Sequence, residues 1–210
     1  MTLTIVRLDT LVGDVQPLPP VRRGFHTMGM AAPIYYTADM VRALPDDGNR
    51  YEVVHGELLV TPAPRASHQL VVTRLTVALA TYLEREQVGV VLVSPADISW
   101  GRSDVLVQPD VFVVAPDDAR TMEWDRMRRL LLVAEVLSPS TARADRFVKR
   151  RRYQEARVPL YWIVDIDERQ VEEWTPESEF PALIHDRLVW HPSGAAQPFA
   201  LELGELFRPI

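Results

Sequence analysis

Short apolar runs, separated by turn-forming and charged residues, make up most of the hydrophobic pattern of this chain. Runs of roughly four to eight residues that are rich in Val and Leu predict buried strands where Pro, Ser or charged clusters bound them. The first such region is expected to be a hairpin that turns at His55 and Gly56. The predicted strands cover residues 51–60, 88–93, 97–100, 108–114, 130–137, 158–164, 171–174, 188–190 and 199–203.

Apolar residues recur at helical spacing in two longer stretches. Ser67 is expected to cap an amphipathic helix over residues 68–86, and the SPST sequence at 138–141 offers a cap for a second helix over about 142–156. A shorter helix is expected after Thr37. The sequence therefore predicts helices interleaved with strands.

The order of these elements predicts the fold class. Helix, strand, strand, strand, helix, strand is typical of an α/β (α+β) layer structure, in which helices flank a mixed β-sheet. Strand 97–100 is expected to continue or pair with strand 88–93, and strand 171–174 is expected at an edge. Residues 1–33 are rich in Pro and Gly and predict a poorly ordered N-terminal tail. Residues 34–210 are then expected to form a single domain.

Composition narrows the class of protein. An apolar content of 47% over 210 residues is sufficient for the core of one domain. No apolar run approaches the roughly 18 residues of a membrane span, and the first residues lack the pattern of a secretory signal. The absence of Cys excludes disulfides and thiolate catalysis, and suits a cytoplasmic location. The net charge of -6 argues against nonspecific binding of polyanions.

Two carboxylates lie at the edges of neighbouring predicted strands, Asp110 in the first and Glu135 in the second. Burial of an unpaired carboxylate is costly, so such acids usually pair with a cation or hold a metal. The helix that follows places Asp145, Lys149 and Tyr153 at spacing i, i+4, i+8, and therefore on one face. If this helix packs on the sheet near Glu135, Lys149 reaches back toward both acids.

Basic residues are concentrated on the same helix. Residues 143–157 contain seven basic residues and two acids, with Arg146 and Arg150 beside the face just described. Lys149 is the single Lys among 23 basic residues, which we take as support for a specific role. Two acids and a Lys suit metal-assisted hydrolysis of a phosphodiester, since Mg²⁺ prefers hard oxygen ligands and a Lys can orient or deprotonate the attacking water.

A purely structural interpretation explains the same residues and carries about equal weight from the residues alone. Asp110 could cap a strand end, Glu135 could pair with Lys149, and the arginines could form a solvated face. Glu52 could be a solvated strand position. His68, in the first turn of its helix, would more often be a capping or packing group than a ligand.

A family resemblance favours the functional interpretation. The segments QPDVFVV, AEVLSPST and D-x-x-x-K-x-x-x-Y followed by VPLYWIVD resemble the Uma2 family (DUF820) of the PD-(D/E)XK restriction-endonuclease-like superfamily, over residues 35–207. The resemblance implies a restriction-endonuclease-like core and a metal-dependent endonuclease that hydrolyses DNA. Asp110 and Glu135 would hold Mg²⁺, or Mn²⁺ in its place, with the Val136 carbonyl as a further ligand.

The resemblance also implies roles for the remaining candidates. Leu137 stands where the superfamily usually has its Lys, so Lys149 would be a migrated catalytic lysine, and a site that binds without cleaving stays open. Glu52, His68 and Tyr153 would support the site.

Partners follow from the same reasoning. Arg146 and Arg150 of the helix would contact DNA phosphates, together with the arginines at 126, 128 and 129. Apolar strand edges and a Trp-rich C-terminal part suggest a homodimer. The alternatives are a catalytically silent nucleic-acid-binding or assembly protein with the same fold, and a toxin or defence component that acts with a partner protein.

Overall fold

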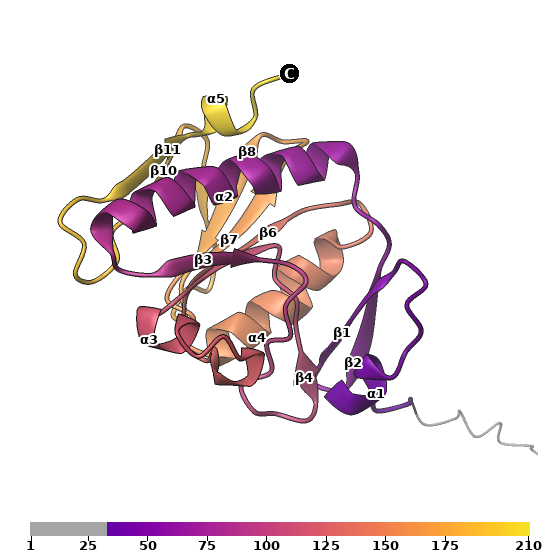
Figure 1. The fold of residues 1–210 in the computed structure, drawn as a ribbon. Helices are drawn as coiled ribbons and strands as arrows, with labels where there is room; N and C mark the ends of the chain where they lie inside the picture. Colours follow the sequence, from indigo (N-terminus) through magenta and orange to yellow (C-terminus); the bar gives the residue numbers. More distant parts are fainter. Residues whose placement is uncertain (1–32) are drawn as a thin grey trace, which may run out of the picture. The chain divides into compact units, whose positions relative to one another are not determined.

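A six-stranded mixed sheet with helices on both faces forms the centre of the molecule (Figure 1). The computed structural model describes residues 33–210, of which residues 34–210 form one compact unit. The predicted tail, residues 1–33, lies outside the described part apart from Pro33. Within residues 33–210, no helix is both long and apolar enough to cross a membrane.

The main sheet has the strand order β3-β5-β6-β7-β8-β9. Its β6–β7 pair is parallel and the other neighbouring pairs are antiparallel, so the predicted mixed sheet is confirmed. The parallel pair requires a crossover, which the helical segment between the two strands provides. The strands are β3 (Val90–Val93), β5 (Val111–Val114), β6 (Leu130–Val136), β7 (Tyr161–Asp165), β8 (Gln170–Trp174) and β9 (Ala182–Ile184).

Side chains of the sheet alternate between two cores. Helix α2 (Ala66–Glu86) packs on one face, where Leu75 and Leu79 meet Val111, Val113 and other strand residues. The opposite face holds Phe112, Val133 and Ile163 and is covered by the segment that includes helix α4 (Arg150–Glu155). Because strand side chains alternate in direction, Asp110 and Glu135 fall on this second face.

A smaller antiparallel sheet, β2-β1-β4, precedes the main sheet in the chain. Strands β1 (Arg50–Val54) and β2 (Glu57–Thr61) form the predicted hairpin, with positive φ angles of 52° at His55 and 79° at Gly56. These angles match a two-residue turn of the primed type. Strand β4 (Val105–Leu106) completes the sheet. Helix α1 (Ala38–Arg42) packs against it, and the Thr37 hydroxyl caps this helix by accepting a hydrogen bond from the Met40 N–H.

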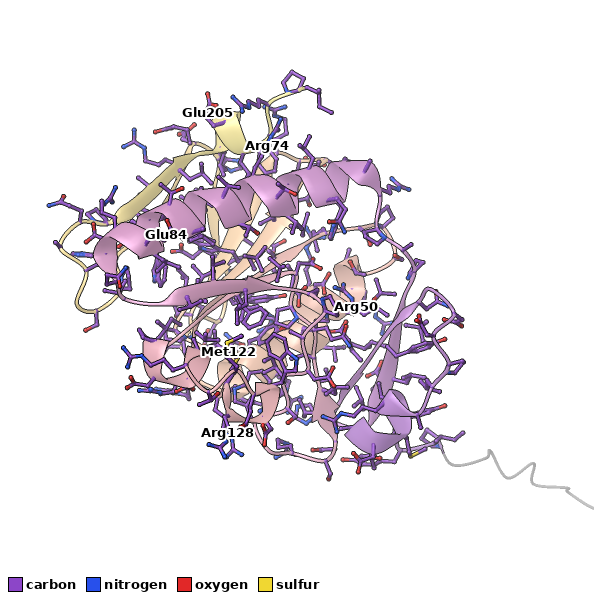
Figure 2. The ribbon with its side chains drawn as sticks, viewed as in Figure 1. Arg50, Arg74, Glu84, Met122, Arg128 and Glu205 are labelled. Carbon is purple, nitrogen blue, oxygen red and sulfur yellow. The ribbon has the colours of Figure 1, made fainter. Side chains whose placement is uncertain are left out.

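The remaining elements are short. Helix α3 (Pro116–Ala119) and a 3₁₀ turn (Trp124–Arg126) lie in the charged connector, residues 115–129, which joins β5 to β6. Strands β10 (Arg187–Trp190) and β11 (Phe199–Glu202) pair with each other, and helix α5 (Leu203–Leu206) follows. Arg74 of α2 extends toward α5 and donates a hydrogen bond to the Leu206 carbonyl at 3.1 Å, which ties the C-terminal segment to α2 (Figure 2).

Three local predictions were wrong. Helix α2 begins at Ala66 with Arg65 as its N-cap residue, so Ser67 is inside the helix and caps nothing. Ile98 bridges to Val107, so residues 97–100 neither continue strand β3 nor pair with it. Strand β8 is an interior strand because the short and partly exposed strand β9 pairs beyond it.

The second predicted helix begins differently from the expected regular helix. Residues Ala144–Lys149 form a π-helical turn, in which the Arg150 N–H donates to the Asp145 carbonyl five residues earlier, and α4 continues from Arg150. Wide turns of this kind are rare and frequently occur at functional sites.

Candidate active site

Asp110 and Glu135 are tied to each other across strands β5 and β6. The register that pairs Val111 with Ala134 places Asp110, one residue before β5, opposite Glu135. The Asp110 N–H donates to Glu135 Oε2 at 3.3 Å, and the Val136 N–H donates to Asp110 Oδ2 at 2.9 Å. Each side chain therefore accepts a backbone N–H of the other strand, which fixes the position of both carboxyl groups where the ladder ends.

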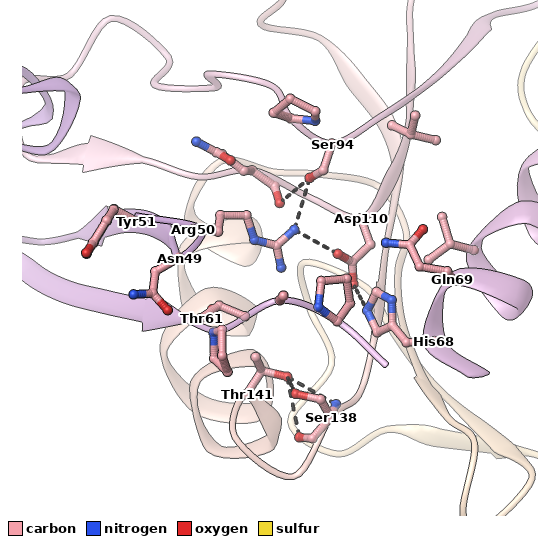
Figure 3. Close-up of a pocket in the computed structure, with 18 of the residues that line it drawn as sticks. Asn49, Arg50, Tyr51, Thr61, His68, Gln69, Ser94, Asp110, Ser138 and Thr141 are labelled. Carbon is pink, nitrogen blue, oxygen red and sulfur yellow. Dashed lines mark hydrogen bonds and ion pairs between the residues drawn. The ribbon is translucent and has the colours of Figure 1, made fainter. Parts of the chain in front are cut away.

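Two further donors converge on Asp110 (Figure 3). Arg50 Nη1, from the first position of β1, lies 2.9 Å from Oδ1, and His68 Nε2, from the first turn of α2, lies 3.1 Å from Oδ2. Burial by itself would raise the pKa of Asp110, but the hydrogen bond with His68 and the charge of Arg50 outweigh burial and hold the pKa well below its usual range. Asp110 is therefore ionised.

Lys149 is buried among three acids and is 1% exposed. Its Nζ lies 2.8 Å from Glu52 Oε2, 3.1 Å from Glu135 Oε1 and 3.4 Å from Asp145 Oδ1. Burial favours the neutral amine, but the charges of Glu135, Glu52 and Asp145 outweigh it and raise the pKa of Lys149 far above its usual range. Lys149 is thus held as a cation, which fits the orienting role expected of it and argues against its expected alternative role as a base.

Tyr153 completes the environment of Glu135. The Tyr153 hydroxyl donates to Glu135 Oε1 at 2.9 Å, and its ring is fully buried. Together, Asp145, Lys149 and Tyr153 lie on one helix face as the spacing predicted. The sequence-predicted residues Glu52, His68, Asp110, Glu135, Lys149 and Tyr153 are all brought together in one cluster.

This cluster holds more carboxyl groups than cations. Four buried carboxyl groups, those of Glu52, Asp110, Glu135 and Asp145, face two permanent cations, Lys149 and Arg50. Burial raises the pKa of Glu135 to about 8 even though Lys149 opposes this shift, since the charges of the other three acids act in the same direction as burial. The site therefore favours an additional positive charge.

Unpartnered polar atoms mark the same place. Within residues 33–210, the buried side-chain atoms without a hydrogen-bond partner include Arg50 Nε and His68 Nδ1 of this cluster. Glu52 Oε2 and Asp145 Oδ1 also lack a hydrogen bond, but each forms an ion pair with Lys149 Nζ, at 2.8 and 3.4 Å. Buried groups without a hydrogen-bond partner are rare in native proteins, and they are typical of sites that take a water, an ion or a ligand.

A pocket of about 1050 Å³ opens over one side of the cluster. Its lining includes Arg50, His68 and Asp110 together with the hydroxyl-rich loop 138–141 (Figure 3). Glu135 and Lys149 are not part of the lining, because Glu135 is 1% exposed and lies beneath the surface with Lys149. The pocket therefore reaches the cluster through Arg50, His68 and Asp110, and Asp110 is the only one of the four clustered carboxyl groups in its lining.

The donor set fits a divalent cation that keeps most of its water. Within residues 33–210, no group of three or more His, Cys, Asp or Glu side chains is arranged as a metal cage. Mg²⁺ does not require such a cage, since it is usually bound by one or two carboxylates, with water and substrate oxygens as the other ligands. Two adjacent carboxyl groups, in a cluster that holds more carboxyl groups than cations, meet this requirement.

The two predicted nucleic-acid contacts on the helix have intramolecular partners. Arg146 forms ion pairs with Asp165 at 2.9 Å and Glu172 at 2.6 Å. Arg150 donates to the Arg146 carbonyl, and its guanidinium lies 4.5 Å from the centroid of the Trp174 ring. These contacts assign both residues a role in packing the helix against β8, and contact with nucleic acid stays a prediction for them.

The connector arginines are also paired within the chain. Arg126 pairs with Glu123 at 2.8 Å and Arg129 with Asp118 at 2.8 Å, while Arg128 donates to the Asp125 carbonyl. All three side chains are on the surface. Their expected contact with phosphates likewise stays a prediction.

Sequence reasoning missed Arg50 and gave Asp145 no role in the site. A signal for Arg50 was present, because positions 50 and 52 of one strand point to the same face. The docking of that face against Asp110, 60 positions later in the chain, is not visible in any local pattern.

Comparison with known proteins adds to this geometry. The family model Uma2, described as "Putative restriction endonuclease", matches residues 38–190. The structure also resembles a crystal structure described as "a putative nuclease belonging to DUF820" from Anabaena variabilis, with a TM-score of 0.66 and 19% sequence identity over 81% of this chain and 97% of the other. No curated protein matches the chain. The fold likeness agrees with the predicted restriction-endonuclease-like core, and because the family model covers most of the chain, this protein belongs to the Uma2 family.

Proposed function

We propose that this protein is a divalent-metal-dependent endonuclease that hydrolyses phosphodiester bonds of DNA. The observation that carries the proposal is the buried cluster that the pocket reaches at Asp110, where four carboxyl groups face two permanent cations. The family description and the likeness to a nuclease fold support the same reaction class.

Asp110 and Glu135 are the proposed metal ligands, with the Val136 carbonyl as a third. A bound Mg²⁺ would supply Lewis-acid stabilisation of the phosphate and a more acidic water. Asp110 is the ligand that the pocket reaches, so the scissile phosphate would approach from that side. The backbone N–H groups of Asp110 and Val136 hold the two carboxyl groups in place before substrate arrives.

Lys149, Tyr153 and Glu52 are proposed to act through Glu135. Lys149 and Tyr153 both contact Glu135 Oε1, which leaves Oε2 oriented toward Asp110. Glu52 holds Lys149 from the opposite side at 2.8 Å and accepts the Gln108 N–H at 2.7 Å. They are positioning residues in this scheme. His68 orients Asp110 in the same manner.

A second candidate function is a nucleic-acid-binding protein without catalysis. The observation in its favour is that Lys149 is almost completely buried and that its three carboxylate neighbours already neutralise it. A purely structural ion-pair cluster would have the same appearance. The two functions differ in whether Asp110 is required for bond cleavage.

Cleavage of supercoiled plasmid and of single-stranded DNA, with Mg²⁺ or Mn²⁺ and with chelator, tests the proposal. Asp110→Asn and Glu135→Gln keep the size of each side chain and remove the charge, so each is expected to lower the cleavage rate by at least about 100-fold. Asp117→Asn, in an exposed acid of α3, is the matched control and should cut as the wild type does. DNA binding without metal-dependent cutting would support the second function, and cutting unchanged by Asp110→Asn would overturn the first.

A further inference from the structure

We propose that Arg50 is a substrate-binding residue that exchanges between two anions, the Asp110 carboxylate and a phosphate of the nucleic acid, and that a divalent cation at Asp110 drives the exchange. This inference rests on the proposed nuclease function. It adds a residue to the site and couples the binding of metal to the binding of substrate.

The contact between Arg50 and Asp110 uses a small part of what a guanidinium can offer. Nη1 alone donates to Asp110 Oδ1 at 2.9 Å and to Ser94 Oγ at 3.1 Å. Nε lies 4.0 Å from Glu52 Oε2 and makes no hydrogen bond among the described residues. Arginine carries five N–H donors in a planar fork, and its strongest pairs with carboxylate or phosphate are bidentate. This single-nitrogen contact therefore leaves donors for a second anion.

The position of Arg50 also sets it in competition with a metal. Asp110 Oδ2 already accepts the Val136 N–H and contacts His68, so Oδ1 is the oxygen with fewer partners, and Arg50 is its neighbour. A dication and a guanidinium on the same oxygen repel each other, and burial strengthens the repulsion. A cation bound at Oδ1 would thus weaken the hold of Asp110 on Arg50.

The pocket beside Arg50 offers space for the displaced guanidinium. Arg50 lines the pocket of about 1050 Å³, and its side chain is 22% exposed. Ser94 Oγ, its other partner, accepts from Arg50 and contacts the carbonyls of Gln108 and Pro109 at 2.8 Å, so Ser94 holds only one end of the fork. A phosphodiester entering this pocket presents the pair of oxygens that the guanidinium fork matches.

Two binding measurements test the exchange without relying on cleavage. Mn²⁺ affinity is measured from the electron paramagnetic resonance signal of free Mn²⁺, and affinity for a fluorescein-labelled 12-nucleotide DNA strand is measured by anisotropy in Ca²⁺, with strand integrity checked on a gel. Arg50→Gln removes the competing cation, so it should bind Mn²⁺ about tenfold more tightly and DNA about tenfold more weakly. Arg50→Lys keeps the charge and loses the fork, so Mn²⁺ affinity should stay near the wild-type value while DNA affinity falls.

Arg85→Gln is the matched control, since Arg85 is also ion-paired, with Glu86 at 2.9 Å. Arg85 lies in the last turn of α2, at the opposite end of the helix from the site residue His68. This variant should leave both affinities unchanged. Weaker or unaltered Mn²⁺ binding in Arg50→Gln would overturn the exchange, because a residue that only positions Asp110 would weaken metal binding when removed. Wild-type Mn²⁺ binding that survives Asp110→Asn would overturn the nuclease proposal itself, which separates the two failures. Thermal unfolding verifies that each variant is folded.

Discussion

The ammonium group of Lys149 lies closer to Glu52, at 2.8 Å, than to Glu135, at 3.1 Å. Glu52 belongs to the N-terminal hairpin and is 0% exposed, whereas Glu135 belongs to the central sheet. The hairpin therefore contributes a charge to the buried cluster in addition to covering it. The arrangement of the proposed site depends on the docking of β1 against the helix that carries Lys149.

Lys149→Met should lower the free energy of unfolding by about 3–5 kcal/mol, because it leaves Glu52, Glu135 and Asp145 buried without their cation. Urea unfolding at neutral pH measures the loss. Arg151→Met is the control on the same helix, since the Arg151 side chain is 75% exposed, and it should change stability by less than about 0.5 kcal/mol. A loss below about 1 kcal/mol for Lys149→Met would show that the acids do not need its charge.

Glu52→Gln should partly compensate for the loss of Lys149. In the Lys149→Met background this change removes one of the uncompensated carboxylates, while an amide oxygen can still accept the Gln108 N–H. The double variant should therefore be more stable than the sum of the two single changes predicts, with a coupling energy of about 1–3 kcal/mol. Additive effects in a double-mutant cycle of unfolding free energies would contradict a direct ion pair.

Tyr153→Phe should cost about 1.5–3 kcal/mol above about pH 8, where Glu135 is ionised. This is the usual range for loss of a hydrogen bond to a charged group, and the ring packing is kept. Tyr161→Phe offers a comparison within the same core, because the Tyr161 hydroxyl donates at 3.1 Å to the neutral carbonyl of Asp145, and it should cost only about 1 kcal/mol. Unfolding in urea ranks the two variants. The reverse ranking would mean that Glu135 gains little from Tyr153.

Stability should fall as the pH rises from about 5 to about 8 in buffer that contains a chelator. Burial, reinforced by the neighbouring acids, raises the pKa of Glu135 from 4.5 to about 8, so in this window the folded protein retains a proton that the unfolded chain has lost. The contribution is complete below the unfolded pKa and disappears as the pH passes the folded pKa, with a slope of at most about 1.4 kcal/mol per pH unit. The Glu135→Gln variant should lose this part of the slope, and an unchanged slope would place the proton elsewhere.

Much of the architecture could be predicted from the sequence because strands and helices leave local periodic signals. The runs around Asp110, Glu135 and Ile163 have the apolar character of strands buried on both faces, and each became a strand of the main sheet or adjoins one. The errors occurred where local signals are weak. Strand β9 is only three residues long and partly exposed, so β8 was expected at the edge. Ser67 was expected to be the N-cap residue, although helix α2 begins at Ala66 with Arg65 as its N-cap residue.

The sequence by itself determined which groups could form a site. Spacing of four residues placed Asp145, Lys149 and Tyr153 on one helix face, and the ends of two apolar runs supplied Asp110 and Glu135. Only the tertiary structure decided how these groups are paired. It brought Glu52 to Lys149 and Arg50 to Asp110, across separations of 97 and 60 positions in the chain. Periodicity reports the direction of a side chain relative to its own element, whereas the partner that it meets depends on how separate elements pack against one another.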